Sequence, residues 1–87
     1  MNEINNLKKK IIYRAEYRGT KEMDTLISSF TKQIINDLNG DELINLSNLL
    51  DIDDENLYKF NQGLSPSVDI EKNKVSKLFK EFKYNKK

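Results

Sequence analysis

The spacing of apolar residues is the feature that most restricts the fold of this chain. Ile4, Leu7, Ile11 and Ala15 recur every three or four residues, which places them along one side of a helix. No stretch alternates apolar and polar residues as a half-buried strand does, and no aliphatic run exceeds two residues. The sequence therefore predicts an all-α protein without a segment that is apolar enough to cross a membrane.

Four further stripes predict four more helices, and turn or capping residues separate them. The predicted boundaries are Arg18-Gly19 after the first helix, Thr20 capping the second, Asn39-Gly40 ending it, Asp41 capping the third, and Asp53 or Asp54 capping the fourth. The further stripes are Met23, Leu26, Ile27, Phe30, Ile34 and Leu38; Leu43, Leu46, Leu49 and Leu50; Leu57, Tyr58 and Phe60; and Ile70, Val75, Leu78, Phe79 and Phe82.

A chain of 87 residues, 37% hydrophobic and 33% charged, has enough apolar material for one core. We expect a compact five-helix bundle that forms a single domain over residues 1–87, with its core within residues 4–82 and a frayed lysine-rich tail. Met23, Tyr58, Phe60, Phe79 and Phe82 are predicted to pack in the core. Tyr13 and Tyr17 lie off the first stripe, and one or both are expected to be exposed and available to a partner.

Composition excludes several classes of function. The sequence contains no Cys and no His, which excludes a disulfide framework, Cys/His zinc sites and histidine acid–base catalysis. We therefore expect no enzyme, no metal site and no catalytic residue. The N-terminus shows neither an apolar signal core nor a transit peptide, which favours a cytoplasmic location of bacterial type.

The net charge is only +1, but the charges are unevenly distributed. Residues 8–21 carry six cations against a single Glu, whereas residues 37–55 carry seven acidic residues and no base. Charge blocks of this kind can orient a protein on a partner, although most are solvated faces.

The segment from Tyr13 to Asp24 permits two interpretations. In the first, Arg18 and Gly19 only end a helix, and Glu22 and Asp24 only interact with the N-terminal dipole of the next. In the second, the turn is a binding surface, because arginine recognises carboxylates or carbonyls with parallel hydrogen bonds and glycine allows close approach. The residue types alone leave both interpretations open.

The order of residues in this segment resembles a known family. Arg18-Gly19-x-x-Glu22-Met23-Asp24 is similar to the RGxxE(L/M)D motif of the succinate dehydrogenase assembly factor 2 family, the SdhE-type FAD assembly (flavinylation) factors. The resemblance extends over residues 7–82 and includes Leu57-Tyr58-Lys59-Phe60, although the family often has Trp at the position of Phe60.

The resemblance implies a five-helix bundle that acts as a chaperone-like assembly factor. Proteins of this family bind the flavoprotein subunit of succinate dehydrogenase and promote the covalent attachment of FAD to a histidine of that subunit. The fumarate reductase flavoprotein is a further candidate partner. No FAD is expected to bind tightly to this chain, which we expect to be a monomer without direct membrane insertion. By position, the partner-binding residues would be Arg14, Tyr17, Arg18, Gly19, Glu22 and Asp24.

Two substitutions follow from this assignment. Gly19→Arg is expected to block docking while the bundle stays folded. Glu22→Ala is expected to weaken function with little loss of stability, because an exposed acid in the first turn of a helix contributes only about 0.3–1 kcal/mol.

Three rival interpretations remain. A small nucleic-acid-binding protein would use the two lysine-rich segments, but the net charge near zero argues against it. An enzyme that uses Glu22 and Asp24 with Arg18 has no supporting nucleophile, phosphate loop or metal spacing. A generic helical module for protein–protein interaction is what the pattern gives without the family resemblance.

Overall fold

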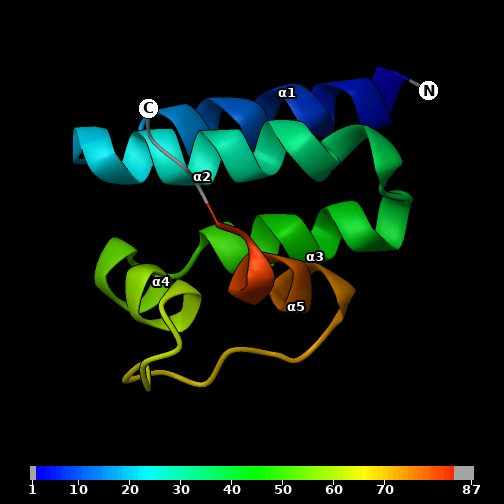
Figure 1. Cartoon of the computed structure of the whole chain (residues 1–87). Helices are drawn as coiled ribbons and strands as arrows, with labels where there is room; N and C mark the ends of the chain where they lie inside the picture. Colours follow the sequence, from blue (N-terminus) through cyan, green and yellow to red (C-terminus); the bar gives the residue numbers. More distant parts are fainter. Residues whose placement is uncertain (1, 84–87) are drawn as a thin grey trace.

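The computed structural model describes residues 2–83 of the chain. These residues contain five α-helices and one short 3-10 helix (Figure 1). This confirms the predicted all-α fold, and no strand occurs within those residues. The predicted frayed tail falls on residues 84–87, outside the described part. The helices are α1 (Asn2–Glu16), α2 (Lys21–Ile34), the 3-10 helix η1 (Ile35–Asp37), α3 (Gly40–Leu50), α4 (Asp54–Asn61) and α5 (Lys74–Glu81).

Side-chain caps set where most helices begin. The Thr20 hydroxyl accepts a hydrogen bond from the backbone N–H of Met23, and the Asp53 carboxylate accepts one from that of Asn56, as the sequence predicted. The predicted cap of the third helix was wrong. Asn39 caps α3 and forms a reciprocal capping box with Glu42, so Gly40 is the first residue of α3 rather than the end of the helix before.

The last helix is shorter than its apolar stripe suggested. Asn73 caps α5 through a capping box with Ser76, so Ile70 lies in the preceding connection and Phe82 follows the helix as its C-cap. Both side chains still pack, partly buried, against the core. An apolar residue can therefore lie on the helical period of a stripe without belonging to the helix.

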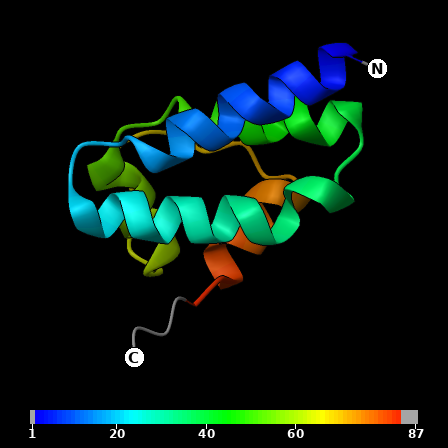
Figure 2. The ribbon, with the colours of Figure 1, turned by 90° about the horizontal axis from the view of Figure 1, so that it is seen from above.

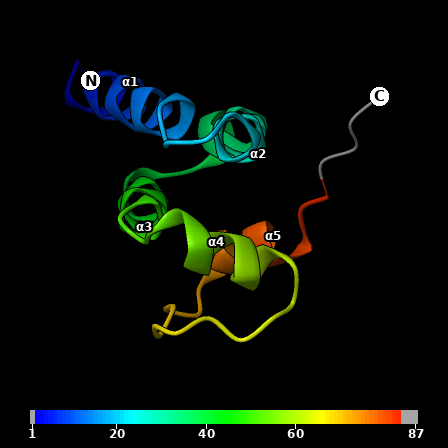
Figure 3. The same cartoon turned by 90° about the vertical axis from the view of Figure 1, so that its left-hand side faces the viewer.

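The helices pack in two groups. α1 and α2 run antiparallel, and α1 also packs on α3 (Figure 2). Seen end-on in Figure 3, α1, α2 and α3 form a triangle, and α4 and α5 lie together below it, with α5 packed on α3. No helix within residues 2–83 is long and apolar enough to span a membrane.

The core is shared by all five helices, and Phe30 and Phe79 are among its largest fully buried side chains. Met23 is buried as predicted, with 7% of its surface exposed. The prediction for Tyr58 was wrong, since 48% of it is exposed. Further buried apolar residues are Ile11, Ala15, Ile27, Ile34, Ile35, Leu38, Leu43, Leu46, Leu49, Leu50, Leu57 and Val75, with Phe60 and Phe82 partly buried against them.

Candidate partner-binding site

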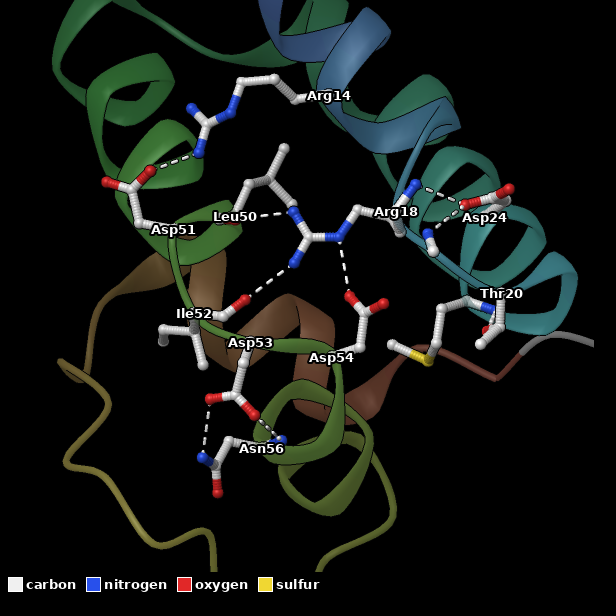
Figure 4. Close-up of polar contacts among 12 residues, drawn as sticks. Arg14, Arg18, Thr20, Asp24, Leu50, Asp51, Ile52, Asp53, Asp54 and Asn56 are labelled. Carbon is white, nitrogen blue, oxygen red and sulfur yellow. Dashed lines mark hydrogen bonds and ion pairs between the residues drawn. The ribbon is translucent and has the colours of Figure 1, made fainter.

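Arg18 lies in the connection between α1 and α2, but its side chain turns into the protein (Figure 4). Its Nη1 donates to the carbonyl oxygen of Leu50 at 2.7 Å, and its Nη2 donates to that of Ile52 at 2.7 Å. Its Nε donates to Oδ1 of Asp54 at 2.9 Å, and only 10% of the arginine side chain is exposed. Arg18 therefore ties the α1–α2 connection to the α3–α4 connection, 32 to 36 residues further along the chain.

Asp24 fixes the same connection from its other side. Its Oδ1 accepts hydrogen bonds from the backbone N–H groups of Arg18 and Gly19, the latter at 3.3 Å (Figure 4). Thr20 adds its cap to Met23 at 3.1 Å. Because side chains satisfy backbone donors that a tight turn would leave unpaired, the backbone of this connection is held in one conformation.

Arg14 makes a second, more exposed link to the same region. It donates to the Ser47 hydroxyl at 3.0 Å and pairs with Asp51. The side chains of the pair are 35% and 66% exposed, so solvent screens this interaction more than that of Arg18. Together the two arginines show that the basic block of residues 8–21 and the acidic block of residues 37–55 pair partly with each other.

Gly19 has a positive φ of +150°, a backbone angle that residues other than glycine rarely adopt. A Cβ added there would lie 3.5 Å from Oδ2 of Asp54, an ordinary contact. The requirement for glycine is therefore one of backbone conformation more than of space. It follows that Gly19→Arg strains the backbone in addition to adding bulk, so this variant is a less selective test of docking than the sequence suggested.

The remaining predicted residues face solvent. Tyr17 is 67% exposed and Tyr13 is 64% exposed, as predicted, and their ring centroids are 4.6 Å apart. Glu22 is also exposed, in the first turn of α2. The six predicted site residues thus lie around one turn in two sets: Tyr17, Gly19 and Glu22 form its exposed surface, whereas Arg14, Arg18 and Asp24 bond within the chain. We call the first set the turn surface.

Sequence reasoning did not identify the groups that hold Arg18. Two of them are backbone carbonyls, of Leu50 and Ile52, which no sequence pattern marks. Asp54 was considered only as a possible helix cap, but the cap is Asp53, whose pKa is lowered chiefly by a hydrogen bond from the Asn56 side chain. The lack of any base among residues 37–55 was the available signal that some of these carboxylates pair with distant arginines.

Comparison with known proteins identifies a family. A family model described as "flavinator of succinate dehydrogenase" matches residues 9–83, which include every residue discussed at this turn. No curated protein and no solved structure matches the chain.

Proposed function

The chain belongs to the family of succinate dehydrogenase flavinators, and from this premise we propose that it binds the flavoprotein subunit of succinate dehydrogenase and promotes covalent attachment of FAD to that subunit. The family has a role in succinate dehydrogenase flavinylation. The observation that best supports the finer proposal is the turn surface, in which Tyr17, Gly19 and Glu22 are exposed at a connection held by part-buried hydrogen bonds of Arg18.

In this proposal the six residues have different tasks. Tyr17, Gly19 and Glu22 contact the flavoprotein directly, with Glu22 offering a carboxylate to its N–H groups or cations. Arg18 and Asp24 act through them, because they fix the backbone on which those side chains are carried. A surface that is already ordered loses less conformational entropy when it binds, and it can hold the flavinylation site of the partner in a competent arrangement.

The proposal includes the other properties expected of such a factor. The chain acts as an assembly factor that forms a one-to-one complex as a monomer, and FAD is held by the partner rather than tightly by this chain. The flavoprotein of fumarate reductase is a second candidate client. Binding to nucleic acid is disfavoured because Arg14 and Arg18, the two arginines of the basic block, are both paired with carboxylates within the chain.

Co-expression tests this function. The flavoprotein subunit is produced with and without this chain in cells that lack their own factor, and covalent flavin is read as fluorescence of the subunit in a denaturing gel. We expect the wild-type chain to raise the signal and Glu22→Ala to lower that gain. Asp41→Ala is the matched control, because Asp41 is also an exposed acid in the first turn of a helix.

The outcomes are distinct. If the wild-type chain leaves covalent flavin unchanged and no complex forms, the proposed function is wrong. If the wild type is active and Glu22→Ala and Asp41→Ala behave alike while both remain helical by circular dichroism, the function stands but the turn surface does not carry it.

A further inference from the structure

A groove opens between the first turns of α2 and α4, next to the turn surface. It has a volume of about 1360 Å³. Glu22 lies in both the turn surface and this groove, so the two form one continuous area. Residues that line it include Lys21, Glu22, Leu26, Glu55, Tyr58 and Lys83.

Both sides of the groove contribute apolar lining residues. Leu26 and Met23 lie on the α2 side and Tyr58 on the α4 side, and Tyr58 is 48% exposed although the sequence pattern places it with core aromatics. A tyrosine combines a rigid apolar ring with a polar end and is enriched where proteins bind one another. A partner that covers Tyr58 would therefore explain why this side chain is exposed in the chain alone.

The two ends of the groove differ in charge. The end at the start of α4 carries the carboxylates of Glu22, Asp54 and Glu55 and one cation, Lys21, the first residue of α2. Arg18 occupies only Oδ1 of Asp54, Glu55 pairs with Lys59 at 3.4 Å while 76% exposed, and Glu22 has no ion pair among residues 2–83. The opposite end, beside Asn61, carries Lys83. The acidic end therefore has carboxylate oxygens available for a cation.

We propose that this groove receives a polypeptide segment of the flavoprotein subunit, with an apolar side chain between Leu26 and Tyr58 and a lysine or arginine at the acidic end. This inference rests on the proposed function and adds the chemistry of the partner segment. The groove exceeds the roughly 300–1,000 Å³ of typical small-molecule sites, and it is an open channel between two helices. These properties fit a length of polypeptide better than an enclosed cofactor.

Affinity measurements with the purified flavoprotein subunit test the groove. We expect Tyr58→Ala to weaken binding about tenfold or more, as is typical when a central interface tyrosine is truncated. Ile44→Ala is its matched control, because Ile44 is 53% exposed on α3 and lies outside the groove; it should change affinity less than about twofold.

A charge reversal tests the acidic end. Glu55→Lys should weaken binding, and the loss should shrink as salt is raised. Asp41→Lys places the same reversal in the first turn of α3, where it has the same unfavourable interaction with a helix dipole but lies away from the groove. We expect Asp41→Lys to leave the affinity almost unchanged.

A photo-crosslinking amino acid at position 58 identifies the occupant. The proposal expects a crosslink to a flavoprotein peptide that contains a lysine or arginine, and loss of that crosslink in Glu55→Lys. It is overturned if free FAD binds the wild type and Tyr58→Ala abolishes that binding, since the groove is then a flavin site. It is also overturned if the crosslink joins two copies of this chain.

The failure of this inference differs from the failure of the proposed function. If Glu22→Ala weakens the complex while Tyr58→Ala and Glu55→Lys match their controls, the turn surface binds the flavoprotein and the groove does not. If the wild type does not bind the flavoprotein at all, the function itself is wrong.

Discussion

The connection between α1 and α2 and the connection between α4 and α5 are held in different ways. The α1–α2 connection is short. Arg18 ties it to carbonyls and a carboxylate from a distant part of the chain, and Asp24 holds its backbone locally. The connection from α4 to α5 is long and holds Leu64, 57% exposed, and Val68, 42% exposed. Its central part is held to α4 by the N–H of Ser67, which donates to Oδ1 of Asn56 at 2.7 Å.

The two connections differ in how firmly they are bonded as well as in length. Loops that bind partners are often regarded as the mobile parts of a protein, yet here the proposed binding turn is the more strongly bonded of the two connections. We expect the number of hydrogen bonds that reach a connection from other elements, rather than its exposure, to determine how firmly it is held. Four predictions test this contrast, in order of decreasing effect.

Arg18→Ala should have the largest effect. The substitution leaves two carbonyls and the partly buried Asp54 without their donor, and we expect a loss of about 2–4 kcal/mol in the free energy of unfolding. Arg14→Ala removes a more exposed pair and should cost about 0–1 kcal/mol. Urea unfolding of both variants measures the difference. Equal losses would show that the internal bonds of Arg18 do not hold the connection.

Gly19→Ala should come next. Its positive φ makes any side chain unfavourable, so we expect a loss of about 1–2 kcal/mol even though the nearest atom is in ordinary contact. Gly40→Ala is the control, because Gly40 is the first residue of α3 and has open space around it; it should be neutral or stabilise by up to about 1 kcal/mol. Thermal unfolding distinguishes the two, and a neutral Gly19→Ala would contradict the conformational requirement.

Asn56→Ala tests the longer connection. It removes the acceptor of Ser67 and the donor to Asp53 at 2.8 Å, and we expect a cost of about 1 kcal/mol. Amide hydrogen exchange should accelerate in residues 62–73 and remain unchanged in residues 17–20. Accelerated exchange in both connections would mean that they are held by one shared network rather than separately.

Acid should have the smallest effect, and part of it should act through Asp53, the cap of α4. The hydrogen bond from the Asn56 side chain lowers the pKa of Asp53 below its usual 3.8, so the folded state binds this proton less readily than the unfolded chain. The contribution of Asp53 to stability is therefore complete above pH 3.8 and is lost as the pH falls below it. The difference in unfolding free energy between wild type and Asp53→Asn should shrink over that range. A constant difference would exclude this linkage.

The sequence predicted the local features of the fold well because they depend on near neighbours. The helical spacing and the caps at Thr20 and Asp53 are set by residues within one or two turns. The error at Asn39-Gly40 is also local, since this pair is typical of both a helix end and a capping box, and only the bond to Glu42 distinguishes them.

The sequence predicted where the candidate site lies, but not which of its side chains point outward and which bond within the chain. The motif marked the correct turn, but nothing in residues 13–24 shows whether Arg18 points outward or inward, because its partners lie 32 to 36 residues away. The prediction that Tyr58 packs in the core was wrong for a similar reason. Its place in an apolar stripe is local, whereas its exposure depends on how α4 is placed against α2 and α5.

The bonds of Arg18 also have a consequence for the order of folding. They join the end of α1 to the end of α3, so they can form only after the three-helix part of the chain has come together. We expect Arg18 variants to change the unfolding rate much more than the folding rate. A half-folded chain then has no ordered turn surface, so under the proposed function only chains that have completed folding would bind the flavoprotein.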